Sequence, residues 1–155
     1  MKRRVLAGFL GAACLMAGAA GAEAPGLATG VVDTGSARTE SFDWGQLITY
    51  YAGDSYAATD SLTAVAIIKP GREIHPPHVH SEEEYLMVLE GEGTWSVQGR
   101  EFPATAGDVL YAAPWDLHGI SNTGTEALKF VVFKWNPKPV EPMPAPERAD
   151  QDPDG

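Results

Sequence analysis

Apolar and polar residues alternate over short distances through the middle of the chain, and no stretch repeats apolar residues at helical spacing. Short runs rich in β-branched and aromatic residues are separated by Gly, Pro, Asn and Asp, with turn signals at intervals of roughly 8 to 12 residues, which is typical of an all-β domain. The predicted strands are Leu47–Tyr51, Leu62–Lys69, Tyr85–Leu89, Thr94–Gln98, Glu101–Pro103, Val109–Ala112, Leu117–Ser121 and Leu128–Trp135, with one more short strand at Gly30–Asp33.

The connections between these strands do not decide among the possible all-β architectures. Tyr85–Leu89 and Thr94–Gln98 follow each other across a Glu-Gly-Glu-Gly sequence, so we expect them to form a hairpin. Many short strands with close turns are compatible with a sandwich or with a closed barrel, including the double-sheet jelly roll. The pattern alone leaves this choice open.

The first 22 residues read as a secretory signal peptide and not as part of the domain. Met1–Arg4 is positively charged, Val5–Ala17 is apolar, and Ala20–Ala22 offers the small residues of a cleavage site. We predict cleavage after Ala22 and release into the periplasm or the medium, with no membrane attachment afterwards. One alternative is a transmembrane anchor, but the apolar run is shorter than the roughly 20 residues that a spanning helix needs. The other is lipid attachment at Cys14, whose preceding sequence fits poorly.

The rest of the chain divides into three predicted parts. Residues 23–43 form a flexible lead-in, and residues 44–135 form the β-barrel. Residues 136–155 contain six prolines and five acidic residues with almost nothing apolar, so this tail cannot bury enough surface to offset its ordering entropy. We expect it to be disordered.

Charge and cysteine content exclude several functions. Cleavage removes three basic residues and leaves 8 against 21 acidic ones, a net charge near −13, which disfavours nucleic acid and anionic membrane surfaces as partners. It also removes Cys14, the only cysteine, and with it any disulfide, thiolate ligand or cysteine nucleophile. An anionic substrate would need a local cationic pocket. The cations nearest the expected site are Arg72, Arg100, Lys129 and Lys134, and the sequence does not decide which point inward.

The densest chemistry lies between Gly71 and Gly91, which holds three of the four histidines. His78 and His80 are two residues apart, so on a strand both rings lie on one face. Glu84 opens the next strand, which we expect to pair antiparallel with the first, and His118 begins a later one. Imidazole and carboxylate donors without sulfur suit Fe, Mn, Ni, Cu or Zn. The alternative is that a His-x-His pair and a glutamate run are incidental surface features.

The spacing of these residues resembles the two motifs of the cupin family. Gly71, His78-x-His80, Glu84 and Gly91 resemble the first motif, and Gly107-Asp108, Pro114, His118 and Asn122 resemble the second. The resemblance covers residues 62–135. The chain departs from the pattern by one extra residue before His78 and one before Pro114, and Asp116 stands where the family has Gly.

The resemblance implies a single cupin jelly-roll β-barrel that holds one divalent transition metal. Its ligands would be His78, His80, Glu84 and His118. Glu82 and Glu83 compete with Glu84 for the carboxylate position, and the six-residue distance to Gly91 selects Glu84. Single-domain cupins are often homodimers, so the resemblance also implies a homodimer.

His75 has two interpretations. It precedes Pro76-Pro77 and is either a turn histidine that packs on proline or a functional group, which would support the metal ligands or act in catalysis as a general base near neutral pH. Asn122 is expected to form a turn.

The function predicted from the resemblance is that of a secreted or periplasmic metalloenzyme acting on a small oxygenated molecule. Dioxygenase chemistry leads, and isomerase, lyase and decarboxylase reactions also occur in the family. The alternative is a non-catalytic module that binds a small molecule or a metal. A third possibility is that the metal is purely structural and only stabilises the fold of the barrel.

Overall fold

The computed structural model describes residues 27–142, and within that range it contains nine β-strands and no helix. The all-β prediction is therefore confirmed. The strands are β1 Arg38–Phe42, β2 Gly45–Gly53, β3 Ala58–Ile68, β4 Glu83–Glu90, β5 Glu92–Val97, β6 Arg100–Thr105, β7 Val109–Ala112, β8 His118–Ser121 and β9 Leu128–Pro137. The predicted signal peptide at residues 1–22 and most of the predicted tail lie outside the described residues, so both remain predictions.

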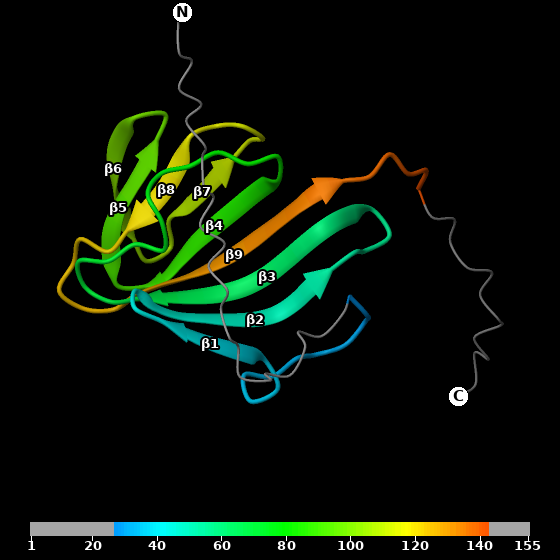
Figure 1. Ribbon diagram of the computed structural model, residues 1–155, viewed down its shortest axis with the longest axis horizontal. Helices are drawn as coiled ribbons and strands as arrows, with labels where there is room; N and C mark the ends of the chain where they lie inside the picture. The colour runs from blue at the N-terminus through cyan, green and yellow to red at the C-terminus, as the bar shows by residue number, and fades with distance from the viewer. Residues whose placement is uncertain (1–26, 143–155) are drawn as a thin grey trace, which may run out of the picture.

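The strands form two antiparallel sheets, as in a double-sheet jelly roll (Figure 1). The larger sheet has the order β1-β2-β3-β9-β4-β7, and the smaller has the order β6-β5-β8. Because β9 pairs with both β3 and β4, the last strand of the described residues lies in the middle of the larger sheet. This long-range pairing brings strands that are distant in the sequence to the walls of one barrel.

Two strand predictions at the N-terminal side are wrong. Gly30–Asp33 is not a strand, whereas β1, within the expected lead-in, is one. The sequence of β1 is Arg-Thr-Glu-Ser-Phe, which has no apolar alternation to signal a strand. It is extended because it pairs with β2 along its whole length, from Arg38 opposite Thr49 to Phe42 opposite Gly45.

The predicted hairpin of Tyr85–Leu89 with Thr94–Gln98 is also wrong. The corresponding strands β4 and β5 belong to different sheets, and the chain crosses from one to the other at Gly91. Gly91 has φ +79°, and a Cβ there would collide with the carbonyl of Ala127, so only glycine allows this crossing. The true hairpin joins β5 to β6 through Gln98 and Gly99, whose φ values of 51° and 73° give the turn twist that suits adjacent antiparallel strands.

The core consists of the inward positions of alternating strands. On β4 the buried residues are Glu84, Leu86 and Val88, with exposed residues between them. On β3 the small residues Ala64 and Ala66 face the interior, opposite Val132 and Phe130 of β9. Small side chains on one strand leave space for large ones on the next, so the layer fills without strain. Glu84 is the one carboxylate in this inward series.

The opposite face of the larger sheet is partly apolar. Its exposed residues include Tyr85, Met87, Val109, Tyr111 and Phe133, which neighbour one another in the registers of β4 with β7 and of β4 with β9. The homodimer stays a prediction.

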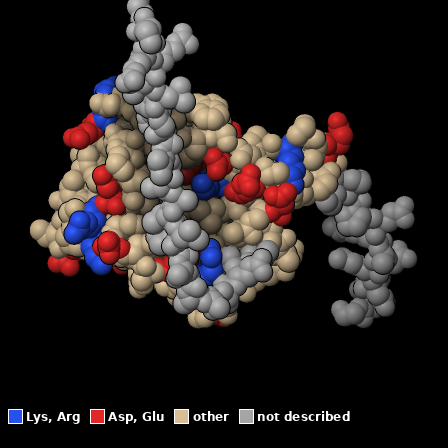
Figure 2. Space-filling view, viewed as in Figure 1, with Lys and Arg blue, Asp and Glu red and all other residues tan. Residues whose placement is uncertain are grey.

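On the face drawn in Figure 2, basic side chains lie in small groups close to acidic ones and form no continuous patch. Among residues 27–142, none belongs to a helix with the length and hydropathy that a membrane crossing requires.

Candidate metal centre

The histidine segment between β3 and β4 is irregular and not a strand, contrary to the prediction. Two isolated bridges hold this segment, one between Glu73 and Ser121 and one between His78 and His118. The amide of His78 donates to the carbonyl of His118 at 2.9 Å, and its carbonyl accepts from the amide of His118 at 3.0 Å. The prediction that this segment pairs with the strand opened by Glu84 is also wrong, since β4 pairs with β7 and β9. His78 therefore lies beside His118, and Glu84 comes from the neighbouring sheet.

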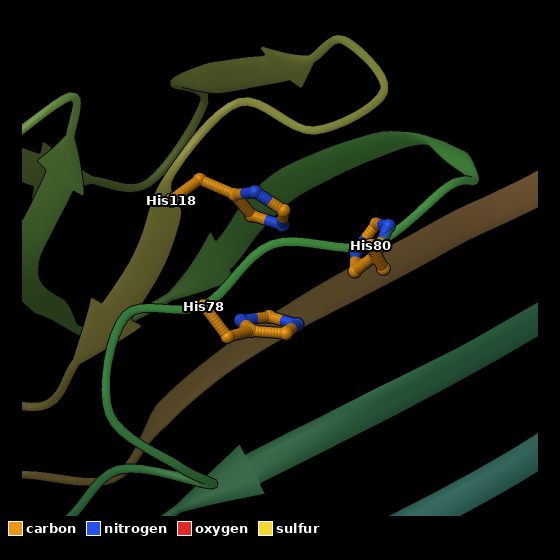
Figure 3. Close-up of side chains that lie close together, drawn as sticks. All are labelled: His78, His80 and His118. Carbon is orange, nitrogen blue, oxygen red and sulfur yellow. The ribbon is translucent and has the colours of Figure 1, made fainter.

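Three of the predicted ligands converge despite this different backbone. One ring nitrogen from each of His78, His80 and His118 lies within 4.8 Å of the other two (Figure 3). His78 and His80 come from the loop before β4, and His118 is the first residue of β8. A cluster of three imidazoles that could hold a metal ion is therefore present in the barrel.

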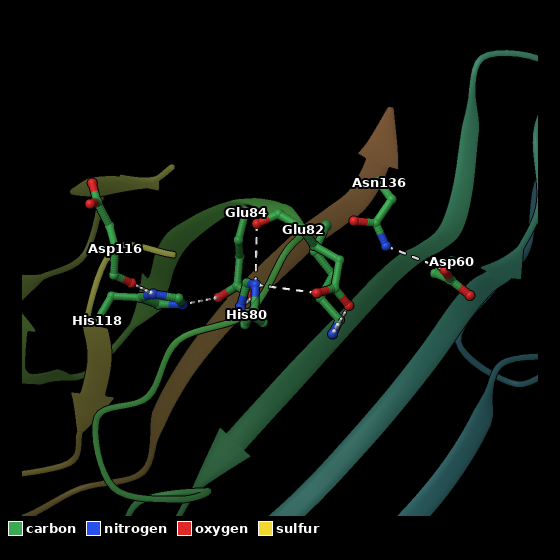
Figure 4. Close-up of polar contacts among 8 residues, drawn as sticks. Asp60, His80, Glu82, Glu84, Asp116, His118 and Asn136 are labelled. Carbon is green, nitrogen blue, oxygen red and sulfur yellow. Dashed lines mark hydrogen bonds and ion pairs between the residues drawn. The ribbon is translucent and has the colours of Figure 1, made fainter. Parts of the chain in front are cut away.

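Glu84 completes a four-residue arrangement with this cluster (Figure 4). Its Oε2 lies 3.2 Å from Nε2 of His80, and its Oε1 lies 3.5 Å from Nε2 of His118. Nitrogen and oxygen ligands bind at roughly 2.0–2.2 Å from such metals, so two neighbouring ligands of one ion lie about 3 Å apart. The separations around Glu84 match that spacing.

Three buried ring nitrogens in this cluster lack a hydrogen-bond partner among residues 27–142. They are Nδ1 of His78, Nε2 of His80 and Nε2 of His118. A buried polar atom without a partner costs roughly 1–3 kcal/mol, and native proteins avoid such atoms. A metal ion supplies the missing interaction to several nitrogens at once. The residues present therefore fit a bound metal by their donor types, their spacing and their unsatisfied atoms.

The other ring nitrogens of two of these histidines are held by hydrogen bonds. Nδ1–H of His118 donates to the carbonyl of Asp116 at 2.8 Å, and Nδ1–H of His80 donates to the carbonyl of Glu82 at 3.1 Å. Because a carbonyl only accepts, the hydrogen lies on Nδ1 and the lone pair of Nε2 is free. Such bonds fix the tautomer and direction of a metal-binding histidine.

Glu82 has a supporting role that the sequence reasoning missed. Its Oε2 lies 3.4 Å from Nδ1 of His80, and its Oε1 accepts a hydrogen bond from Nζ of Lys134 at 3.1 Å. From the sequence, Glu82 was predicted only as a competitor for the ligand position of Glu84. The sequence signal for this supporting role was the position of Glu82 two residues after His80, a predicted ligand. That distance lets the carboxylate reach Nδ1 of the same imidazole.

The structure also places the three other candidate residues, His75, Glu83 and Asn122. His75 is exposed, its Nδ1 bonds to the carbonyl of Pro76 at 3.2 Å, and its ring centroid lies 3.9 Å from that of His78. Glu83 lies outside the cluster, with its carboxylate 3.4 Å from the hydroxyl of Tyr111. Asn122 is buried and donates to the carbonyls of Ile68 and Glu126, both at 2.8 Å, so it ties loops together.

A cavity of about 200 Å³ opens beside the cluster. His75, His78, Glu84 and His118 form part of its wall, and Lys134 is the one cation among the lining residues. The other lining residues are largely apolar and come from both sheets: Trp44, Leu47, Leu62, Ile74, Leu86, Gly119, Ile120, Phe130 and Val132. A small molecule in this cavity would touch a hydrophobic wall and the candidate metal ligands together.

Burial and mutual contacts set the protonation of these groups. Burial, followed by the neighbouring histidines, lowers the pKa of His78 to about 4. The Glu84 carboxylate, 3.5 Å from Nε2 of His118, raises the pKa of His118 against the opposing effect of burial. Burial raises the pKa of Glu84, but His118, His80 and Lys134 outweigh it and leave the pKa lowered. At neutral pH, Glu84 is thus ionised and His78 is neutral, as metal ligands must be.

Metal affinity is expected to fall as the pH is lowered from about 8 through the ordinary histidine range near 6.5. A proton competes with the metal first at His118, whose pKa is raised, whereas His78 stays neutral down to about pH 4. Without metal, the folding stability that His118 contributes depends on pH in the opposite direction to the metal affinity. Because the pKa of His118 is raised in the folded protein, this stability is present below the unfolded pKa and is lost as the pH rises through the folded pKa. Competition titrations with a chelator, corrected for the protonation of the chelator, measure the affinity. An affinity that stays constant across this range would contradict the ligand role of His118.

Comparison with known proteins identifies the class of this barrel. Residues 64–134 match the family described as "Cupin domain". The matched residues run from β3 to β9 and include the three-histidine cluster, so this part of the chain is a cupin domain.

Two curated relatives are similar over parts of the chain. A gentisate 1,2-dioxygenase from Streptomyces sp is 33% identical over 82 residues, which are 52% of this chain and 23% of that protein. An oxalate-binding protein from Thermotoga maritima is 33% identical over 64 residues, or 41% of this chain and 53% of that protein. The chain thus spans less than two thirds of the length of either relative.

Solved structures show the same fold. A structure described as a predicted oxalate decarboxylase from Thermotoga maritima has a TM-score of 0.57 and 26% identity, covering 68% of this chain and 98% of that one. The structure of CapF with an inhibitor has a TM-score of 0.55 at 17% identity over 64% of this chain and 30% of that one, a likeness of fold alone.

Proposed function

We propose that this protein is a metal-dependent enzyme that acts on a small oxygenated molecule, with dioxygenation as the leading reaction. The observation that carries the proposal is the convergence of three unsatisfied imidazole nitrogens and one carboxylate at the wall of an apolar cavity of about 200 Å³. Four protein ligands leave two positions open on a six-coordinate metal, whereas they would fill a tetrahedral one. Fe, Mn, Ni and Cu therefore suit the proposal better than a four-coordinate Zn.

A divalent metal bound by these residues would supply Lewis-acid or redox chemistry at its open positions. The protein itself would contribute orientation and the exclusion of water. Glu82 and the carbonyl of Asp116 hold two of the imidazoles in place, and the apolar wall around Leu86 and Phe130 would shield the substrate. His75, which lies against the ring of His78 and lines the cavity, is the proposed carrier of a proton to or from the substrate.

The leading reaction takes its support from the similarity to a gentisate 1,2-dioxygenase. The second candidate function, a module that binds a small molecule without converting it, takes its support from the similarity to an oxalate-binding protein. The exposure of His75 also favours the second candidate, because it leaves the cavity without a buried acid–base group besides the proposed ligands. The proposed location is the periplasm or the medium, on the sequence of residues 1–22 alone.

Removal and return of the metal separate these functions. Protein treated with a chelator, then reloaded separately with Fe(II), Mn(II), Ni(II) or Cu(II), should consume oxygen with a phenolic or enolic acid in a panel of small substrates, and only in a reloaded form. Oxygen electrode traces and product analysis would measure this turnover. Calorimetric binding without turnover by any reloaded form would support the binding module instead.

The structural possibility needs a second measurement on the same samples. If the metal only staples the barrel, chelation should abolish the fold. Circular dichroism of the chelated protein checks this point, and an intact β spectrum with lost binding or turnover supports the proposal. Neither turnover nor binding by reloaded, folded protein would contradict both functions.

A further inference from the structure

Lys134 is the one cation among the residues that line the cavity. It lies on β9, where strand alternation places it on the same side as Phe130 and Val132, two residues of the buried core. It is also the direct cross-strand partner of Glu84 on β4. A positive charge therefore stands inside the barrel, next to a proposed metal ligand.

This position is unusual for a lysine in so acidic a chain. The other described lysines bind partners away from the cavity: Lys69 bonds to the carbonyl of Asp43, Lys129 to Glu90 and Lys138 to Asp54. Lysines are rarely placed towards an apolar interior unless they are paired or used. An anionic substrate of so acidic a protein needs a local cationic group, and Lys134 provides one at the cavity.

The ion pair of Lys134 with Glu82 leaves capacity for a second anion. An ammonium group has three hydrogens, and within residues 27–142 the hydrogen bond to Oε1 of Glu82 at 3.1 Å uses one of them. The side chain of Lys134 is 28% exposed, so its head group is not sealed by protein atoms. Glu82 fixes the lysine in place and leaves donors for a ligand.

The charges of the lining residues favour an acid as ligand. The acidic and basic side chains among them are Glu84 and Lys134, and Lys134 is also paired with Glu82 just outside the lining. A bound divalent metal would offset the two carboxylates, so that Lys134 would leave the site with a positive balance. The rest of the wall is mainly apolar, which favours a hydrocarbon body over a fully polar one. The cavity thus suits a small organic acid with a carboxylate, a neighbouring oxygen and an apolar or aromatic body.

We infer that Lys134 binds the carboxylate of such an organic acid while a neighbouring oxygen of the same molecule faces the metal site. The inference rests on the proposed function, because it assumes that the metal site is occupied. It adds the class of the substrate and names the residue that selects it. Lys134 is here a binding residue that determines specificity.

The test compares two probes that differ in charge and little in shape. Salicylate carries a carboxylate beside a hydroxyl, and salicylamide replaces the carboxylate by a neutral amide. Protein loaded with one equivalent of Ni(II) is titrated with each probe by calorimetry. A hydrogen bond to a charged group contributes enough for the wild type to prefer salicylate by about 10- to 100-fold.

Three variants assign that preference to Lys134. Lys134→Met should remove most of the preference and leave only the part that the charge of the metal confers, and Lys134→Arg should retain most of it because the charge remains. Lys129→Met is the matched control: it removes the same charge from the same strand, at a lysine paired with Glu90, and should keep the full preference. A melting curve and the nickel content of each variant are measured alongside.

The results separate this inference from the proposed function. Failure of the wild type to take up nickel or any divalent metal would overturn the proposed function and this inference with it. Normal nickel content together with an unchanged preference in Lys134→Met, or with no preference in the wild type, would overturn the inference alone. Loss of most of the preference in Lys134→Met with retention in Lys129→Met supports it.

Discussion

Replacing His80 with alanine is expected to remove bound metal from this protein almost completely. The substitution deletes one of four converging donors, and it also frees Glu84, whose Oε2 lies 3.2 Å from Nε2 of His80. Changes to groups that merely support a ligand lower metal affinity by about 10- to 100-fold, so the loss of a ligand should exceed that range. Metal content by mass spectrometry on protein purified without added metal measures the effect.

The neighbouring histidine provides the control for this substitution. His75→Ala removes the same side chain five residues away, from an exposed position outside the cluster, and should leave the metal content unchanged. His80 is only part-buried, so its loss should spare the fold. Metal at 100 times its dissociation constant should stabilise the wild type by about 2.7 kcal/mol and should not shift the melting of His80→Ala. Equal metal content in the wild type and His80→Ala would contradict the ligand assignment.

Glu82→Ala is expected to weaken metal binding by about tenfold, near the lower end of the range for supporting residues. The carboxylate of Glu82 lies 3.4 Å from Nδ1 of His80 and helps to direct Nε2 towards the cluster. The effect should be smaller than the loss of a ligand, because Nδ1 of His80 keeps its hydrogen bond to the backbone carbonyl of Glu82 at 3.1 Å. Titration against a chelator of known affinity measures the change.

Glu83→Ala is the matched control for Glu82→Ala. It removes the same charge at the next residue, whose carboxylate lies near the hydroxyl of Tyr111 and away from the cluster. Its affinity for metal should equal that of the wild type. Equal affinities for Glu82→Ala and the wild type would show that the backbone carbonyl alone directs His80 and that the Glu82 side chain has no supporting role.

The sequence predicted most of the strands because their inward residues alternate with outward ones. The same alternation, together with the distance to Gly91, separates Glu84 from Glu83, and the structure places Glu84 inward. Strand β1 escaped prediction because its residues are mostly polar and its conformation depends on pairing with β2. The sheet change at Gly91 was missed because a glycine after a strand also signals a hairpin turn, and only the tight approach to Ala127 tells the two apart.

The grouping of the three histidines was predictable from the sequence, whereas the backbone that carries them was not. The spacing of His78 and His80 suggested a strand, yet the segment is held by isolated bridges to Ser121 and His118, long-range contacts that no local pattern encodes. The inward direction of Lys134 follows from the register of β9 between β3 and β4, a long-range pairing that the sequence alone did not fix. The role of Glu82 depends on the same pairing, because its partner Lys134 lies 52 residues away.

The central claim is that one metal ion is held by His78, His80, Glu84 and His118. Anomalous diffraction from crystals of the protein purified without added metal tests it most directly. The account predicts one anomalous peak per chain, at about 2.0–2.2 Å from a ring nitrogen of each histidine and from a carboxylate oxygen of Glu84. No peak at this position, or a peak bound by other residues, would contradict it.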